Sequence, residues 1–249
     1  NHDTERNGST LSYADGAVRL WDLDTQTLRA LLPAPAPWAT CLAISTDAPA
    51  LLAVGHGDGA VRVWDLRTTE GLRQLSGTVH VRAVAFTRSR TGQPLLAVAR
   101  VGTGIEVWDA TNWTRVNHLA PDTRVGALVA TESPLGEPRL IASTERLGGE
   151  EPTGSLHLWD PEGVDPLAEA TTGWITALAT GSTASGERLL ATGHGDGTFR
   201  IWDAQTDLRP GPTVEAAAGK ITGLAVLPPE GTVALAVGSA GSIGLWTLG

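Results

Sequence analysis

Six tryptophans that recur at a nearly constant spacing constrain this chain more than any other feature of its sequence. Successive members lie 43, 44, 51, 43 and 44 residues apart, and they are Trp21, Trp64, Trp108, Trp159, Trp202 and Trp246. Asp follows five of them, and Thr247 follows the last. Self-similarity at such a period is the signature of a repeat architecture, in which each copy folds into one supersecondary unit.

An apolar residue stands one and three positions before every repeat tryptophan, as Val63 and Val61 do before Trp64. Alternation with a period of two predicts a β-strand. Gly lies five positions before the tryptophan in five of the six copies. In three copies an Asp precedes this Gly, and these are Asp15, Asp58 and Asp196. An Asp-Gly pair between two apolar runs predicts a tight hairpin turn, because both residues tolerate positive φ.

Three further strand-like segments accompany the Trp-bearing strand in the repeat. One, such as residues 95–98, precedes the turn, and a short outer one, such as residues 116–119, follows the Trp. The third lies furthest upstream and carries a small residue at its third position, which suits strands crowded around a central channel. These innermost strands are expected to begin at Ala39, Val81, Val125, Ile175 and Ile221. Four strands in each copy of about 43 residues predict the blade of a β-propeller.

The six registered copies resemble the WD-repeat family across essentially the whole chain, and the alanine-rich style resembles WD-repeat regions of large bacterial signalling proteins. The resemblance implies an all-β fold, a β-propeller of four-stranded antiparallel blades, that is a rigid interaction platform and usually lacks catalysis. The family's Gly-His pair before the innermost strand is missing, since Gly77-Thr78 stands in that place. We therefore expect that the family's Asp–His–Ser/Thr–Trp hydrogen-bond network does not form.

The strand count over residues 1–249 predicts about five complete blades with partial blades at the ends. The first copy lacks an innermost strand and the last lacks an outer one, so the two ends do not complete each other's blade. Open sheet edges invite aggregation, which favours closure by additional strands. We expect residues 1–249 to form one WD-repeat domain that is a segment of a longer chain, within a six- or seven-bladed ring.

Charge and cysteine content narrow the function. The net charge of −9 opposes binding to nucleic acid, because proteins neutralise phosphates with Lys and Arg. No apolar run is long enough to span a membrane. The single cysteine, Cys41, cannot form an internal disulfide, which fits the reducing cytoplasm. We expect a cytoplasmic protein with no nucleic-acid or membrane partner.

One glycine-rich motif occurs twice, as Gly55-His56-Gly57-Asp58-Gly59 and again at residues 193–197. A phosphate-binding loop opens a helix, whereas this motif opens the Trp-bearing strand. His56 and His194 stand in separate copies without Cys or His at ligand spacing. The nucleophile elbow and the phosphate-loop pattern are both absent. We expect a turn here, and no catalytic residue, metal or cofactor in the chain.

Two columns of mixed residue types are the candidate partner-binding positions. One residue directly precedes each innermost strand, and these are Trp38, His80, Arg124, Trp174 and Lys220. The second column lies eight residues before the repeat Trp and includes Tyr13, His56, Arg100 and His194. Aromatic and cationic types are enriched at binding hot spots. We expect both columns at one mouth of the propeller.

The six repeat tryptophans are expected to be structural residues of the core, and the turn residues Asp15, Asp58 and Asp196 are also expected to be structural. The chain as a whole is expected to be a non-catalytic scaffold that binds a protein or peptide. One alternative is the sensor or autoinhibitory region of a larger signalling ATPase or kinase, whose partners would be other domains of the same polypeptide. Another is a propeller that binds a small ligand or a sugar at the channel mouth, where Trp38 and Trp174 would stack on it.

Overall fold

Strands are the only regular secondary structure among the residues that the computed structural model describes. The described residues are 17–22, 24–32, 38–47, 49–146, 153–183, 186–204, 207–216, 219–227, 233–239 and 242–248. The chain divides into a first unit, Asn1–Val84, and a second unit, Ala85–Gly249. No helix long and apolar enough to cross a membrane occurs in this part of the chain.

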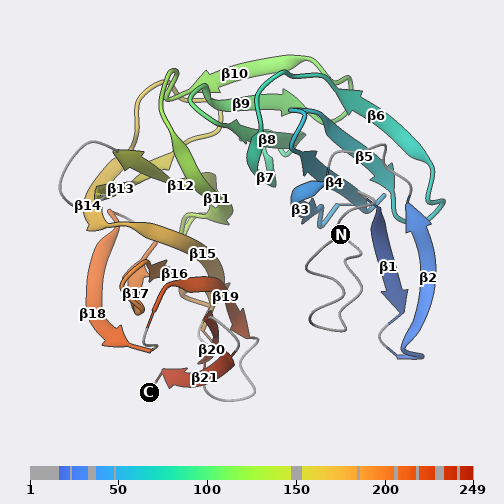
Figure 1. Ribbon diagram of the computed structural model, residues 1–249. Helices are drawn as coiled ribbons and strands as arrows, with labels where there is room; N and C mark the ends of the chain where they lie inside the picture. Colours follow the sequence, from blue (N-terminus) through green and yellow to red (C-terminus); the bar gives the residue numbers. More distant parts are fainter. Residues whose placement is uncertain are drawn as a thin grey trace. The chain divides into compact units, whose positions relative to one another are not determined.

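The first unit contains a two-stranded and a four-stranded antiparallel sheet (Figure 1). The smaller sheet pairs β1 (Val18–Asp22) with β2 (Thr27–Leu32). The larger runs in the order β3-β4-β5-β6, with β3 (Ala39–Ile44), β4 (Leu51–His56), β5 (Val61–Asp65) and β6 (Gly71–Leu75). The strand predicted at residues 10–13 lies outside the described residues.

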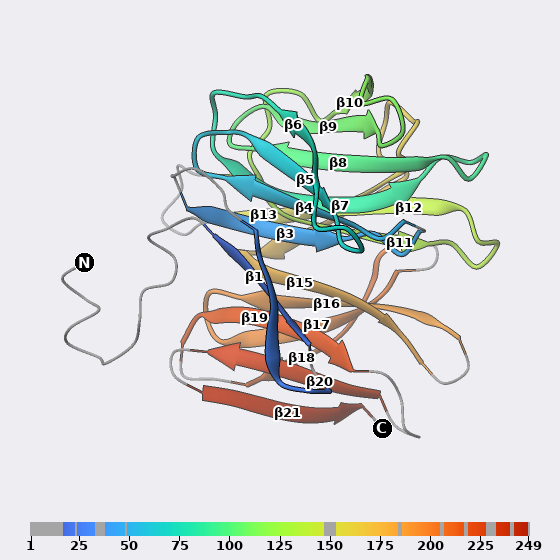
Figure 2. The same ribbon diagram turned by 90° about the vertical axis from the view of Figure 1, so that its right-hand side faces the viewer.

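The other sheets lie in the second unit, except that β7 begins before residue 85. Three have four strands and the last has three, each in sequence order (Figures 1 and 2). The strands are β7 (Val81–Arg88), β8 (Pro94–Arg100), β9 (Gly104–Asp109), β10 (Arg115–Leu119), β11 (Val125–Glu132), β12 (Pro138–Arg146), β13 (Thr153–Trp159), β14 (Ala168–Gly173), β15 (Ile175–Ser182), β16 (Arg188–His194), β17 (Thr198–Asp203), β18 (Arg209–Glu215), β19 (Ile221–Leu227), β20 (Val233–Ser239) and β21 (Ser242–Leu248).

The predicted all-β architecture of four-stranded antiparallel blades is confirmed. The strands β3, β7, β11, β15 and β19 begin at the five residues predicted for the innermost strands. The sequence predicted about five complete blades. Four sheets are complete in the described residues, while β1-β2 and β19-β20-β21 form partial ones.

Two of the buried repeat tryptophans pack against the sheet that precedes their own. Trp202 of β17 clusters with Leu156 and Leu158 of β13, and Trp64 of β5 clusters with Val18 of β1. The apolar residues that alternate before one tryptophan thus form the surface on which the next tryptophan lies. Both faces of a blade are covered in this way, so its strands need apolar residues on both sides.

A threonine at the second position of the innermost strand links neighbouring sheets at two places. The Thr176 hydroxyl donates toward the carbonyl oxygens of Gly193 (3.1 Å), in its own sheet, and Ile221 (2.6 Å), in the next. Thr40 makes the same pair of contacts, with Gly55 at 3.0 Å and Val81 at 2.8 Å. A short side chain is required here, because the innermost strands lie close together.

The expectation that all six repeat tryptophans are core residues is wrong for Trp21, whose side chain is 56% exposed. Its sheet is the first one described, and no described sheet precedes it to cover the indole. Ile243 and Leu245 of the last sheet are 80% and 70% exposed for the complementary reason, since no described sheet follows them. The other tryptophans are buried (Trp64, Trp159 and Trp202) or half-buried (Trp108 and Trp246).

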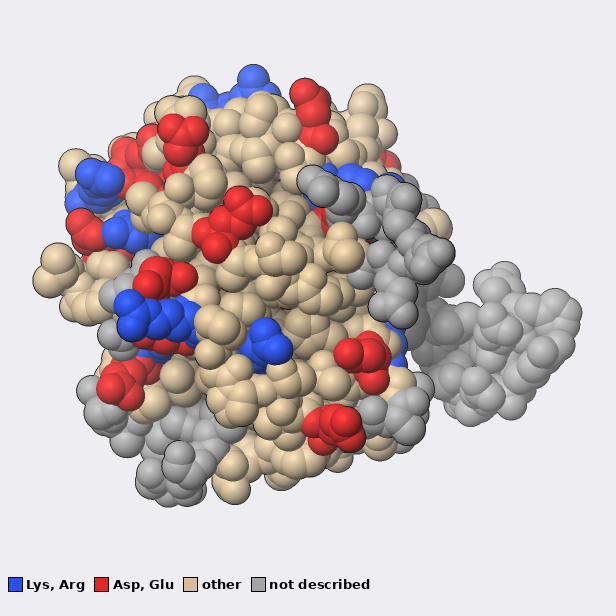
Figure 3. All heavy atoms as spheres, turned by 90° about the vertical axis from the view of Figure 1, so that its left-hand side faces the viewer, with Lys and Arg blue, Asp and Glu red and all other residues tan. Residues whose placement is uncertain are grey.

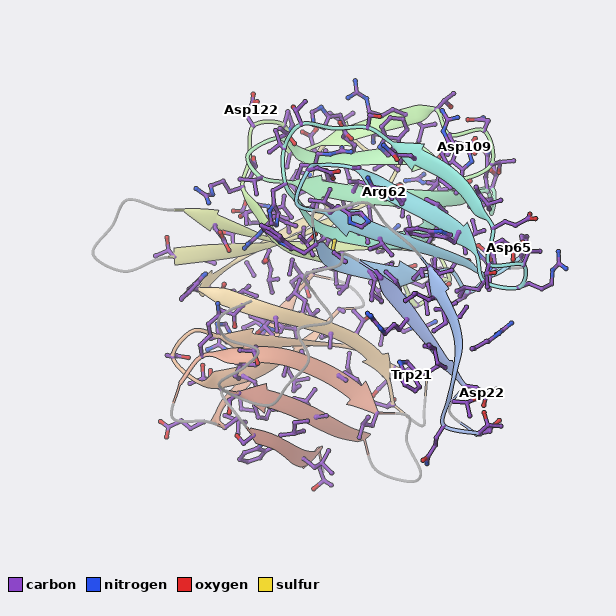
Figure 4. The ribbon with its side chains drawn as sticks, turned by 45° about the vertical axis from the view of Figure 1, so that its right-hand side comes forward. Trp21, Asp22, Arg62, Asp65, Asp109 and Asp122 are labelled. Carbon is purple, nitrogen blue, oxygen red and sulfur yellow. The ribbon has the colours of Figure 1, made fainter. Side chains whose placement is uncertain are left out.

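The Asp of the Trp-Asp pair organises the turn between the Trp-bearing strand and the outer strand. Asp65 Oδ1 accepts hydrogen bonds from the backbone N–H groups of Arg67 (2.7 Å) and Thr68 (3.2 Å) at the end of β5 (Figure 4). Asp109 caps the turn after β9 in the same way, accepting from Thr111 at 2.7 Å. An Asp side chain that satisfies backbone donors two or three residues ahead is a turn-forming device. This role explains why Asp follows the tryptophan.

Burial should separate two tryptophans that the repeat pattern treats alike. Trp202 is 1% exposed and Trp21 is 56% exposed. Trp202→Ala is expected to lower the free energy of unfolding by about 3–5 kcal/mol, the range for large aromatic deletions in cores. Trp21→Ala is expected to cost less than about 1 kcal/mol, as surface substitutions do. Urea denaturation of both variants measures the difference, and equal losses would contradict the packing described above.

Candidate interaction surface

The first glycine of the repeated glycine-rich motif sits where neighbouring sheets approach most closely. A Cβ added to Gly55 would lie 2.5 Å from Val81 Cγ1, the first residue of the next innermost strand. In the second copy of the motif, a Cβ on Gly193 would lie 2.5 Å from Ile221 Cγ2. Real side chains do not approach this closely, so only glycine allows the innermost strands to pack at this distance.

The middle glycine of the motif contacts a tryptophan side chain. Gly57 N–H donates to the Trp38 carbonyl (3.3 Å), and Gly195 N–H donates to the Trp174 carbonyl (3.0 Å). A Cβ on Gly195 would lie 2.4 Å from Trp174 Cε3, and one on Gly57 would lie 3.5 Å from Trp38 Cε2. Each indole therefore lies over a bare stretch of backbone that fixes its position.

The last two residues of the motif form the turn itself. Asp196 Oδ1 accepts from Thr198 N–H (2.9 Å), and Asp58 Oδ1 accepts from Ala60 N–H (2.9 Å). The Thr198 N–H holds the pKa of Asp196 below its usual value. The prediction that both turn residues adopt positive φ is wrong, because only Gly59 and Gly197 do so, at 86° and 90°. The loop is a three-residue hairpin with a glycine as its third residue. Asp15 lies outside the described residues.

The prediction that the second column lies at the mouth of the propeller is wrong, because its described side chains are buried. His56, Arg100 and His194 are 0%, 4% and 6% exposed, and Tyr13 lies outside the described residues. Each of the three is the last residue of a second strand and lies between sheets instead of at the mouth. Arg100 forms an ion pair with Glu106, which also accepts from the Trp108 indole at 3.3 Å. These residues belong to the buried polar framework of the blades.

His194 forms a three-member hydrogen-bonded chain with Thr192 and Trp202, without the Asp of the full Asp–His–Ser/Thr–Trp network. Trp202 Nε1 donates to Thr192 Oγ1 (2.9 Å), and the same oxygen lies 2.9 Å from His194 Nε2. The histidine comes from the end of β16 and not from the loop before the innermost strand, where the family has its Gly-His pair. In the sequence, the residue that indicates this hydrogen-bonded chain is Thr192. Val54 and Val98, which have no hydroxyl, occupy the same register position in two other sheets. Burial lowers the pKa of His194.

The first predicted column presents accessible side chains. Trp38 is 57% exposed, Arg124 and Lys220 are exposed, and His80 and Trp174 are half-buried. In an antiparallel meander, the loop before the innermost strand and the turn before the Trp-bearing strand lie at the same end of the sheet. The column therefore shares this end with the glycine-rich turns that seat Trp38 and Trp174.

Three members of the column form a row in the second unit. Arg124, Trp174 and Lys220 directly precede β11, β15 and β19, which lie side by side (Figure 2). Lys220 Nζ lies 4.8 Å from the centroid of the Trp174 ring, a cation–π distance. Within the described residues neither Arg124 nor Lys220 forms an ion pair. We call this set the cation–indole row.

Several basic side chains elsewhere in the second unit are paired with carboxylates. Arg188 Nη2 pairs with Glu132 Oε2 at 2.6 Å, and Arg90 Nε donates to Asp160 Oδ2 at 2.6 Å. Figure 3 shows acidic and basic side chains intermixed among uncharged ones on the face that it presents. The uncompensated cations of the cation–indole row therefore stand out in a chain whose net charge is −9.

The fold and the site define a class: an all-β repeat protein of antiparallel blades, with loops that present aromatic and cationic residues at one end. The WD40 family model (WD domain, G-beta repeat) matches residues 27–65 and 166–203. The resemblance to WD repeats is thus confirmed at two places in the chain. The first matched segment begins at the outer strand of one sheet and ends at the Trp-Asp pair of the next. No curated protein matches the chain in a sequence comparison.

The buried histidine predicts a loss of stability in acid. Because the folded-state pKa of His194 lies below that of the unfolded chain, the unfolded chain binds a proton more readily. Stability present at neutral pH is therefore lost as the pH falls through about 6.5 toward the folded-state pKa. Urea midpoints at about pH 7.5 and about pH 5.5 measure this loss. His194→Asn is expected to reduce it, and an unchanged loss in that variant would contradict the assignment. The same acid-induced loss of stability is measured for His157→Asn, because burial also lowers the pKa of His157. This variant shows how much of the loss comes from the second buried histidine.

Proposed function

We propose that this chain is a non-catalytic interaction scaffold that binds a protein or peptide through accessible residues before its innermost strands. In the second unit these residues are the cation–indole row, and in the first unit, taken by itself, the residue is Trp38. WD40 repeats generally mediate protein–protein interaction, and this fold offers a rigid framework of hydrogen-bonded blades. Rigidity favours affinity, because side chains that are already fixed lose little freedom on binding.

The observation that carries the proposal is that large indoles are held in place at solvent-accessible positions. Trp38 is 57% exposed, although its backbone carbonyl is bound by Gly57 N–H and its ring lies over that glycine. Trp174 is fixed likewise over Gly195, with Lys220 above its ring. An exposed Trp gains little for the folded chain alone, whereas Trp is among the residues that dominate binding free energy at interfaces.

The double variant Trp38→Ala with Trp174→Ala tests this proposal. Its affinity for a partner identified with the wild-type chain, measured by calorimetry, is expected to fall by at least about 2 kcal/mol, or roughly thirtyfold. The thermal midpoint is expected to stay close to that of the wild type, because neither indole is in the core.

A matched control is Trp113→Ala. Trp113 is half-buried in the turn after β9, which lies at the opposite end of its sheet, and it should leave affinity unchanged. Wild-type affinity in the double variant, or an equal loss in the control, would show that partners bind elsewhere.

A further inference from the structure

Arg124 and Lys220 differ from most cations of the second unit, because no carboxylate among the described residues pairs with them. Their side chains are exposed, and neither forms an ion pair in the part of this unit that the structure describes. The arginines of the unit that do pair with an Asp or Glu side chain are Arg90, Arg100, Arg115, Arg139, Arg188 and Arg209. Arg200 instead donates to the Thr213 hydroxyl. The two cations without a carboxylate are the two members of the cation–indole row.

The row has a fixed order, in which an indole lies between two cations. Arg124, Trp174 and Lys220 directly precede β11, β15 and β19, which follow one another in space (Figure 2). Cα atoms of β15 approach those of both neighbouring strands within 8 Å. The three side chains therefore stand at successive positions along one end of the sheets, close enough for one short segment of a partner to contact all of them.

The indole holds one of the cations in place without neutralising it. Lys220 Nζ lies 4.8 Å from the centroid of the Trp174 ring, and the ring itself contacts the backbone at Gly195. A cation–π contact attracts the ammonium but leaves its charge unchanged. An ammonium carries three N–H donors and a guanidinium five. No described residue accepts a hydrogen bond from either cation of the row, so these donors are available to a ligand.

Three acidic residues lie at the same end of these sheets, and none of them pairs with the row. Asp122 is in the loop before β11, Glu145 is near the end of β12, and Asp196 is in the turn before β17. Asp196 Oδ1 accepts hydrogen bonds from the N–H and the hydroxyl of Thr198, at 2.9 Å and 2.8 Å, and is thereby committed to its own turn. The carboxylates that the row lacks must therefore come from a ligand.

We propose that the cation–indole row binds an extended acidic segment of a partner protein, whose carboxylates pair with Arg124 and Lys220 on either side of Trp174. This inference rests on the proposed scaffold function and names the chemistry of the partner. Alternate residues of an extended chain point to the same side, and three of them span about 13 Å. An acidic, an apolar and an acidic residue at alternate positions thus match the order of the row. The net charge of −9 does not prevent this, because at physiological salt the Debye length is about 8 Å and local pairing decides.

The test follows the Trp174 side-chain N–H resonance in nitrogen–proton correlation spectra of the full chain, where it is the resonance missing in Trp174→Phe. The acidic probe is acetyl-Glu-Ala-Leu-Ala-Glu-amide, and its neutral control is acetyl-Gln-Ala-Leu-Ala-Gln-amide, both at constant ionic strength. The acidic peptide is expected to shift the resonance saturably. The neutral peptide is expected to bind at least about tenfold more weakly, because charge-assisted hydrogen bonds are about twice as strong as neutral ones.

Reversal of the two charges provides the sharpest variant. Arg124→Glu combined with Lys220→Glu is expected to abolish binding of the acidic peptide and to bind acetyl-Lys-Ala-Leu-Ala-Lys-amide instead. The matched control is Arg209→Glu, because Arg209 is an exposed arginine at the opposite end of its sheet and pairs with Asp207. This control should bind the acidic peptide as the wild type does.

The absence of a saturable Trp174 shift with the acidic peptide would overturn the inference, and so would equal binding of the acidic and neutral peptides. Thermal unfolding shows whether the charge-reversed variant is folded. If it is not, Arg124→Gln with Lys220→Gln decides, since that variant is expected to bind both peptides equally, and a retained preference for the acidic one would refute the assignment. Failure of the scaffold function itself has a different sign, which is wild-type partner affinity in the double variant Trp38→Ala with Trp174→Ala.

Discussion

The packing of a buried repeat tryptophan on the preceding sheet, as at Trp64 and Trp202, is the interaction on which the rest of this structure depends. Trp202 reaches across to Leu156 and Leu158, and those two residues are themselves the alternating positions before Trp159. One sequence pattern therefore supplies both halves of the sheet–sheet interfaces at Trp64 and Trp202. The same rule explains where it fails, since Trp21 lies in the first described sheet and Ile243 in the last, and both are exposed.

Close approach of the innermost strands imposes the second constraint. Gly55 and Gly193 leave room for Val81 and Ile221, and the threonine hydroxyls then bridge the adjacent carbonyl groups. The same glycine-rich turns carry Trp38 and Trp174 on their middle glycines. The turn that permits blade packing is thus also the support of the proposed binding residues, which links the stability of the fold to the geometry of the surface.

The column before the innermost strands is accessible to solvent, whereas the column predicted before the hairpin turn is buried. Both columns mix aromatic and cationic residues, so residue type does not distinguish them. Strand direction does, because the last residue of a second strand still alternates into the space between sheets. His194 and Arg100 are buried for this reason, and they bond to Thr192 and Glu106 instead of facing solvent.

By itself the sequence determined the repeat, the all-β class, the order of strands and the starting residues of the innermost strands. Those features follow from periodicity and turn chemistry, which act between residues close together in the chain. Only the tertiary structure decided which polar side chains are satisfied. The hydroxyl that binds the Trp202 indole comes from a neighbouring strand ten residues away, and its replacement by Val54 leaves Trp64 without that acceptor. Hydrogen-bond partners across strands depend on register and burial, and these are fixed only when the sheets pack.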